Sequence, residues 1–264
     1  MKAVILAGGM GTRLREETEF RPKPMVEIGD RPILWHIMKH LSTFGITDFI
    51  IAVGYKGDII KDYFLNYGTR NNDFTVQLGQ RESLIIHGSH DESNWTVTLV
   101  DTGLDTSTGG RVKQAARYLD SQPFLVTYGD GLSNVDIGEL TRFHEGHGQI
   151  GTVTLGQPVS RFGVAEVSTD GFISRFREKP QLDGWVNIGY FIFEHEFLVN
   201  LNDSSILEKE PLATLAAEGS LKAYRHRGYW QPMDTYKEAE GLNELWRSGQ
   251  APWQHVWNGT NALG

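Results

Sequence analysis

The sequence contains no cysteine and has little positive charge. The lack of cysteine excludes a disulfide framework, a thiolate-ligated zinc site and a cysteine nucleophile. Lys and Arg number 25 against 33 Asp and Glu, which leaves a net charge of −8. Without a basic excess the chain is not expected to bind nucleic acid through the phosphate backbone. A small anionic ligand remains possible, because it needs only a few local cations.

Long hydrophobic runs are also missing. No segment approaches the roughly 20 apolar residues that a membrane-spanning helix needs. The apolar run Ala3–Ala7 is too short for the core of a signal peptide, and glycines interrupt it at once. We therefore expect no membrane association and a cytoplasmic location.

The length and composition fit a globular protein with a sizeable core. The chain has 264 residues, of which 39% are hydrophobic, enough for one large domain or two small ones. Repeats, low-complexity tracts and long linkers are lacking. We expect a single domain over residues 1–264, with a loosely ordered tail over 249–264 because that segment is rich in Gly and Asn.

Short apolar runs alternate with amphipathic stretches along the chain, which predicts an α/β fold. The expected strands cover residues 3–7, 49–53, 75–78, 84–87, 96–100 and 124–128, and residues 151–194 are rich in β pattern. The expected helices cover residues 32–44, 57–67, 111–119, 136–146, 208–218 and 235–247. This order favours a mixed, mostly parallel central sheet with helices on both faces.

A glycine-rich loop, Gly8–Arg13, directly follows the first expected strand. Its glycines would let backbone N–H groups approach an anion closely, although a bare tight turn has the same composition. The loop lacks the Gly-Lys-Ser/Thr of a P-loop and the third glycine of a dinucleotide fingerprint. Arg13 and the proline-flanked Lys23 add two cations, and the combination suits a polyphosphate.

These segments resemble the signature of the sugar-nucleotide pyrophosphorylases, a nucleotidyltransferase family. The resemblance rests on Leu6-Ala-Gly-Gly-Met-Gly-Thr-Arg-Leu14 and Arg21-Pro-Lys-Pro-Met-Val26. Further blocks are similar to the cytidylyl branch, namely residues 26–29, 33–39, 100–103, 108–111, 127–131 and 230–235. The resemblance implies a three-layer, Rossmann-like fold with a β-rich sugar-binding side.

The resemblance also implies the residues that bind the nucleotide. These are Leu6, Ala7, Gly8, Gly9, Met10, Gly11, Thr12, Arg13, Lys23, Thr106, Gly110, Arg111 and Gly129. Among them Arg13 and Lys23 are expected to take part in catalysis. Arg111 is a candidate donor to the cytosine ring, although an arginine at the start of a helix can also be a plain surface residue.

Two acidic residues are candidates for a metal site. Asp130 follows the C-terminal end of a strand, where open α/β sheets bind ligands, and Asp234 lies in a turn before the last expected helix. Two carboxylates together with phosphate oxygens suit Mg²⁺. Asp234 could instead cap the helix that follows. The resemblance implies that both acids hold Mg²⁺ and that Asp130 is catalytic.

The sugar phosphate is expected to bind on the β-rich side. Lys179 is fixed by the proline that follows it, and the resemblance implies that it contacts the phosphate beside Glu178. Asn187 and Gly189 match a sugar-contacting segment of the family. Ile188, which lies between them, replaces a small residue of the family pattern and could affect the choice of sugar.

The implied reaction is CTP plus α-D-glucose 1-phosphate giving CDP-glucose and pyrophosphate, with a homo-oligomer as the implied assembly. A thymidylyl- or uridylyltransferase would carry the same phosphate and metal residues, and a regulator without catalytic activity would be expected to lose them. The pairs His36/His40 and His144/His147 are interpreted as helix-surface residues rather than metal ligands. The consecutive Ser89, His90 and Asp91 cannot form a catalytic triad.

Overall fold

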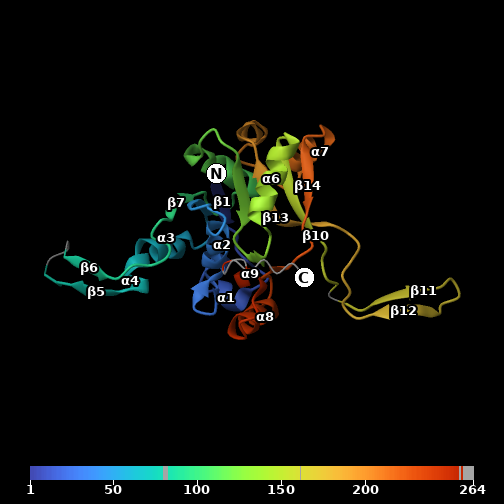
Figure 1. Ribbon diagram of the computed structural model, residues 1–264, viewed down its shortest axis with the longest axis horizontal. Helices are drawn as coiled ribbons and strands as arrows, with labels where there is room; N and C mark the ends of the chain where they lie inside the picture. The colour runs from blue at the N-terminus through green and yellow to red at the C-terminus, as the bar shows by residue number, and fades with distance from the viewer. Residues whose placement is uncertain (80–82, 161, 256, 258–264) are drawn as a thin grey trace.

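The computed structural model describes residues 1–79, 83–160, 162–255 and 257. A seven-stranded sheet forms its centre, in the order β14-β10-β13-β8-β1-β4-β7 (Figure 1). Its strands are β1 Lys2–Ala7, β4 Asp48–Val53, β7 Thr96–Asp101, β8 Phe124–Tyr128, β10 Gly151–Gly156, β13 Val186–Phe193 and β14 Leu221–Arg225. Only β13 runs antiparallel to its neighbours, so the expected mixed, mostly parallel sheet is confirmed.

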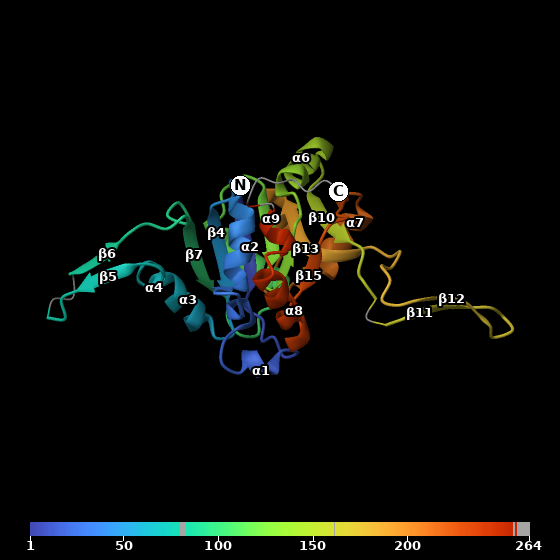
Figure 2. The ribbon, with the colours of Figure 1, turned by 60° about the horizontal axis from the view of Figure 1, so that its bottom comes forward.

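Helices cover both faces of this sheet and make three layers (Figure 2). One face packs against α2 Ile33–Ser42, α3 Gly57–Leu65, α6 Ile137–His147, α8 Tyr236–Arg247 and α9 Pro252–His255. The other face packs against α5 Thr108–Ala115, the 3₁₀ turn His195–Asn200 and α7 Glu210–Ala217. Successive side chains of β1 alternate between these two cores: Ala3 and Ile5 enter one, and Val4 and Leu6 enter the other.

Shorter elements connect these layers. They are α1 Arg15–Thr18, the 3₁₀ turns Lys23–Met25 and Ala116–Tyr118, α4 Tyr67–Asn71, and the strand pairs β2 Glu27–Ile28 with β3 Arg31–Pro32 and β9 Gly131–Ser133 with β15 Trp230–Pro232. The pair β9–β15 brings Asp130 close to Asp234, because Gly131 pairs with Pro232. The backbone N–H of Met233 also donates to the Asp130 carbonyl at 2.8 Å.

Two β-hairpins extend from the body in opposite directions (Figures 1 and 2). One is β5 Asp73–Val76 with β6 Leu84–His87, and the other is β11 Val164–Val167 with β12 Ile173–Arg177. Both expose large apolar side chains: Phe74, Val76, Leu84, Ile85 and Ile86 on the first, and Val167, Ile173 and Phe176 on the second. We call these two segments the first and second arms.

Several sequence predictions are wrong. The expected loose tail after Gly249 includes Ala251 and Trp253, which are both fully buried, and α9; residues 256 and 258–264 of that tail lie outside the described part. His36 and His40 are buried within α2 rather than on its surface, and their ring Nε2 atoms lie 2.8 Å from the carbonyls of Ile28 and Val135. Burial lowers the pKa of both imidazoles to about 4, so they remain neutral core residues.

The histidines of α6 also differ from the surface interpretation. His144 is buried and His147 is half-buried, and a ring nitrogen of each bonds the hydroxyl of Thr152 on β10. Burial lowers the pKa of both rings. These histidines therefore join helix to sheet. Across the described ranges, no cluster of three or more His, Asp or Glu side chains is arranged to hold a metal, and no helix is long and apolar enough to cross a membrane.

Candidate active site

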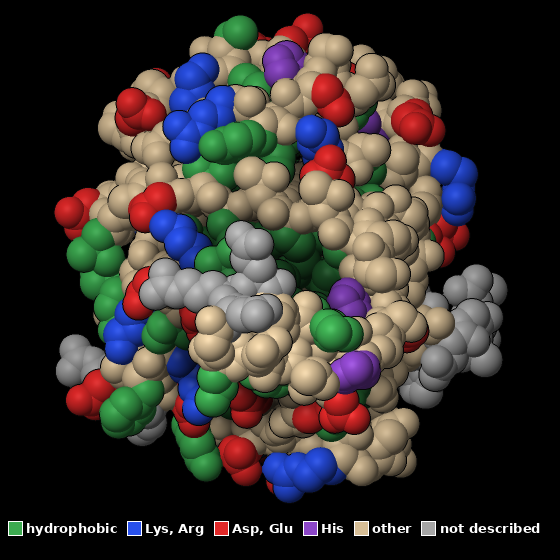
Figure 3. All heavy atoms as spheres, turned by 90° about the vertical axis from the view of Figure 1, so that its left-hand side faces the viewer, with side chains coloured by type: hydrophobic (Ala, Val, Ile, Leu, Met, Phe, Trp, Pro, Cys, Tyr) green, Lys and Arg blue, Asp and Glu red, His purple; other side chains and the backbone are tan. Residues whose placement is uncertain are grey.

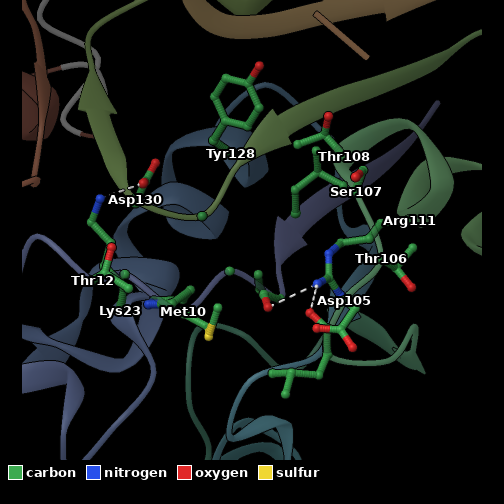
Figure 4. A pocket seen from close by; sticks show the side chains of 18 of the residues that line it. Met10, Thr12, Lys23, Asp105, Thr106, Ser107, Thr108, Arg111, Tyr128 and Asp130 are labelled. Carbon is green, nitrogen blue, oxygen red and sulfur yellow. Dashed lines mark hydrogen bonds and ion pairs between the residues drawn. The ribbon is translucent and has the colours of Figure 1, made fainter. Parts of the chain in front are cut away.

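A cavity of about 730 Å³ opens at the carboxyl ends of β1, β7 and β8. It is lined by residues 6–13, 23–24, 104–108, 111, 128–130, 206, 208 and 234. In Figure 4, Lys23 and Asp130 lie on one side of this cavity and Arg111 lies on the opposite side. The position agrees with the rule that open α/β sheets bind ligands beyond the carboxyl ends of their strands.

The predicted nucleotide residues gather around this cavity. All of Leu6–Arg13 line it, together with Lys23, Thr106, Arg111 and Gly129. Gly110 does not: its backbone N–H bonds the Ser205 carbonyl at 3.0 Å, and it packs against the chain at Asp203. Of the thirteen predicted residues, Gly110 alone therefore supports the wall from behind.

Lys23 links the two predicted metal ligands. Its ammonium Nζ lies 2.7 Å from Oδ2 of Asp130 and 2.7 Å from Oδ1 of Asp234. The prolines on either side hold it in a 3₁₀ turn, and its side chain is only 10% exposed. Burial alone would lower the pKa of Lys23, but the attraction and hydrogen bonds of Asp130 and Asp234 outweigh it and raise the pKa above its usual value.

Asp234 is held by two cations rather than by a helix terminus. Arg13 Nη1 lies 2.9 Å from its Oδ2, in addition to the contact with Lys23. The N-cap of α8 is the next residue, Thr235, which forms a capping box with Glu238. The alternative that Asp234 is a capping residue is therefore wrong, and the residue lines the cavity.

The Arg111 guanidinium packs beneath the glycine loop. The residue is 5% exposed, and its terminal nitrogens donate to the Thr102 hydroxyl and to the carbonyls of Gly8, Val53, Gly103 and Leu104. A side chain on Gly8 would overlap this guanidinium, so a glycine is required there. Arg111 thus joins the loop after β1 to the segment after β7, and it is not a surface residue.

The predicted sugar residues lie outside the cavity wall. Glu178 and Lys179 follow β12 at the base of the second arm, where Lys179 has a positive φ of 43° and contacts Glu178 at 3.9 Å. Asn187 on β13 reaches the cavity through Tyr128, because its Nδ2 lies 3.4 Å from the phenolic oxygen. Gly189 has a φ of 88°, and a side chain there would overlap the Tyr128 ring.

Sequence reasoning missed several polar residues of the wall, among them Tyr128 and Glu208. The Tyr128 hydroxyl donates to Oε1 of Glu208, and the Thr108 hydroxyl donates to Oε2 at 2.7 Å. Tyr128 stands next to the predicted Gly129 and Asp130, which is a usable signal. Glu208 has no such signal, because it lies 80 residues after Tyr128 in the sequence and the two meet only in the folded protein.

The arrangement of the two acids fits a divalent cation. Two carboxylate oxygens already share one positive charge, the Lys23 ammonium, at equal distances. Mg²⁺ is often held by one or two carboxylates and completed by water and phosphate oxygens. Asp130 and Asp234 are therefore the carboxylates of this cavity that could hold a divalent cation.

Comparison with known proteins places the chain among nucleotidyltransferases. The nucleotidyl transferase family matches residues 2–235. A glucose-1-phosphate cytidylyltransferase of Salmonella typhi is 48% identical over 257 residues, covering 96% of this chain and 99% of the relative. A probable glucose-1-phosphate cytidylyltransferase of Bacillus subtilis (strain 168) is 42% identical over 259 residues, covering 97% of this chain and 100% of the relative.

Solved structures share the fold at lower identity. HddC from Yersinia pseudotuberculosis superposes with a TM-score of 0.68 at 23% identity, covering 93% of this chain and 99% of that one. An apo UDP-glucose pyrophosphorylase also gives 0.68, at 18% identity, covering 94% and 98%. The family matches most of the sequence, and two relatives align over nearly their whole length. Both findings lead to one conclusion: the chain belongs to the nucleotidyl transferase family.

Proposed function

We propose that the protein transfers a cytidylyl group from CTP to α-D-glucose 1-phosphate, giving CDP-glucose and pyrophosphate. The single observation that carries this proposal is the cavity in which the glycine loop, Arg13 and Lys23 face Asp130 and Asp234. Two relatives that align over nearly their whole length support the base and the sugar: one is named a glucose-1-phosphate cytidylyltransferase and the other a probable one. The family and the preserved charged residues argue against a regulator without activity.

The mechanism that fits this site is a direct in-line displacement. An oxygen of the sugar phosphate attacks the α-phosphorus of CTP, and the bond from that phosphorus to the pyrophosphate oxygen breaks. The attacking phosphate is already an anion, so no general base is required. The residues have to offset repulsion between two anions: Arg13 and the loop N–H groups hold the leaving pyrophosphate, and Lys23 holds the α-phosphate.

Asp130 and Asp234 are the residues that we propose to hold Mg²⁺. When bound, Mg²⁺ supplies positive charge to the phosphate oxygens without adding a proton. The contribution of the chain is the spacing of the two carboxylates, which the β9–β15 pair fixes on one side and the capped start of α8 fixes on the other. Mn²⁺ binding followed by paramagnetic resonance tests this assignment directly, because Asp130→Asn should weaken it at least tenfold in the presence of CTP.

Lys179, Glu178, Asn187 and Gly189 form the proposed sugar side. Lys179 supplies a cation for the attacking phosphate, and Asn187 an amide for the hexose. The contact of Asn187 with Tyr128 supports its place in the site. Arg111 lines the wall that is proposed to receive the base, and Gly110 lies behind that wall. A thymidylyl- or uridylyltransferase would need the same phosphate residues, and no observed contact favours either.

The two arms support the proposal of a homo-oligomer. A two-stranded hairpin is at best marginally stable in water, yet both arms expose apolar side chains that the described chain leaves uncovered. Figure 3 looks onto the end from which the first arm extends, where hydrophobic side chains lie among charged ones. Light scattering should give a mass of several protomers, and Ile86→Asp should reduce it; a wild-type monomer would contradict the proposal.

The single domain and the cytoplasmic location also stay predictions.

Product analysis tests the proposed reaction. CTP, glucose 1-phosphate and Mg²⁺ should give CDP-glucose and pyrophosphate in equal amounts, identified by mass spectrometry and a coupled phosphate assay. Asp130→Asn is the matched control, because it keeps the shape of the side chain and removes its charge. Wild-type protein that produces pyrophosphate without a nucleotide sugar, or neither product, would refute the proposal.

A further inference from the structure

A chain of hydrogen bonds connects the two proposed substrate sides. It begins at Thr108 on α5, passes through Glu208 and Tyr128 in the cavity wall, and ends at Asn187 on β13. In Figure 4, Tyr128 and Thr108 lie beside each other on one wall. The proposed mechanism assigns no role to Glu208 or Tyr128.

The donor and the acceptor of each of these hydrogen bonds can be assigned, starting from Thr108. The Thr108 oxygen accepts the Leu207 N–H at 2.9 Å, so its hydrogen is directed to Glu208. An ionised carboxylate only accepts, so the Tyr128 hydroxyl must also donate to Glu208. Burial, and then the hydrogen bond and charge of Glu208, raise the pKa of Tyr128, which keeps that hydrogen in place.

The same logic fixes the amide of Asn187. Because the Tyr128 hydrogen is committed to Glu208, its oxygen can only accept, and Asn187 Nδ2 is the donor at 3.4 Å. The Asn187 carbonyl Oδ1 accepts the Gly189 N–H at 2.8 Å, which agrees with this orientation. Nδ2 carries two hydrogens, and Tyr128 uses one. The second is left as a donor of fixed direction.

We propose that Glu208 is a positioning residue for the sugar: acting through Tyr128, it orients the Asn187 amide so that its second N–H donates to a hexose oxygen. This inference rests on the proposed function, because it assumes that Asn187 faces the sugar. The inference names Nδ2 as the atom of Asn187 that contacts the sugar, and the Glu208 carboxylate as the group that orients it. Glu208 touches neither the reacting phosphorus nor the base in this account.

Replacing either partner should disturb the sugar selectively. The two hydroxyls donate to different oxygens of Glu208, and Gln at position 208 would replace one of these oxygens with an amide NH2 donor. One hydroxyl would then lose its acceptor, which disturbs the hydrogen-bond series that ends at Asn187. Tyr128→Phe removes the link entirely. We expect Glu208→Gln and Tyr128→Phe each to raise the KM for glucose 1-phosphate about tenfold, the size of one positioned hydrogen bond. The KM for CTP should stay within about twofold.

Two comparisons separate positioning from a structural role. The double variant should raise the KM for glucose 1-phosphate no more than either single variant does, because both substitutions interrupt the same series of hydrogen bonds. The effect should also disappear for one monodeoxyglucose 1-phosphate, the analogue that lacks the oxygen which Asn187 contacts. Tyr224→Phe is the matched control: Tyr224 donates to Glu139 at 3.1 Å far from the cavity wall, so its loss should leave both KM values unchanged.

Calorimetric titration with glucose 1-phosphate measures the sugar affinity of each variant without turnover. The effect of the substitutions on sugar binding can therefore be measured even if the proposed reaction does not occur. Equal weakening of both substrates, additive losses in the double variant, or a thermal shift with no change in sugar affinity would overturn the inference. A tenfold loss of sugar affinity that persists equally for every deoxy analogue would also overturn it.

Discussion

The Lys23 ammonium lies 2.7 Å from Asp130 and occupies the position between the two carboxylates that we assign to the metal. Lys23 therefore has two tasks in this account. In the free protein it offsets the repulsion between Asp130 and Asp234, and during the reaction it neutralises charge at the α-phosphate. The first task stabilises the fold of the site, and the second serves the transition state.

Lys23→Ala should lower kcat/KM for CTP by about 10²–10³, the usual effect of losing one well-placed charged donor. The fold should survive, because the carboxylates left behind still contact solvent and Arg13 still reaches Asp234. Steady-state kinetics and thermal unfolding measure the two effects separately. Lys237→Ala, an exposed position on α8, is the control and should change neither. Turnover of Lys23→Ala near the wild-type rate would contradict the phosphate assignment.

Arg111→Met should destabilise the protein rather than simply change its base preference. The substitution removes the donors for several buried carbonyls, and each unpaired buried group costs about 1–3 kcal/mol. We therefore expect the free energy of unfolding in urea to fall by about 3 kcal/mol or more. A variant as stable as wild type that prefers UTP to CTP would show instead that Arg111 mainly reads the base.

Lys179→Ala should raise the KM for glucose 1-phosphate far more than the KM for CTP. Lys179 lies at the base of the second arm, away from the cavity wall that holds the triphosphate residues. Initial rates with each substrate varied in turn give both constants. An effect confined to CTP would reverse the assignment of the two substrate sides. Lys209→Ala, which alters an exposed lysine, serves as the control.

The buried histidines predict how stability depends on pH. The pKa of His40 is about 4 in the folded protein against 6.5 in the unfolded chain, so only the unfolded chain takes up the proton between these values. The free energy of unfolding should therefore fall as the pH drops from about 6.5 to 4, by on the order of 2–3 kcal/mol for His40. His40→Gln should flatten this slope in urea titrations; an unchanged slope would show that His40 does not set it.

Local signals in the sequence predicted the core of the site. Gly8–Arg13 directly follow the end of β1, Lys23 is marked by the prolines on either side, and the glycines around Asp130 mark the end of β8. The environment of Arg111 was not readable, because the carbonyls that it binds come from segments up to 103 residues away. The same holds for Glu208, whose partners only the folded chain brings together.

The error on His36 and His40 was avoidable in part. These positions fall three and seven residues after Ile33, on the apolar face that also carries Ile37 and Leu41. Histidine polarity argued for the surface, whereas helical periodicity argued for burial, and periodicity prevailed because backbone carbonyls satisfy the rings. The buried tail had a comparable signal in Trp253, an apolar residue within a segment whose composition suggested a loop.

The most direct test of the central claim compares CTP, UTP, dTTP, ATP and GTP in parallel, with glucose 1-phosphate, Mg²⁺ and pyrophosphate release as the readout. We expect a clear preference for CTP. Turnover with UTP or dTTP in preference to CTP would contradict the cytidylyl assignment while leaving the phosphate and metal residues in place. No release with any nucleotide would contradict the proposed reaction itself.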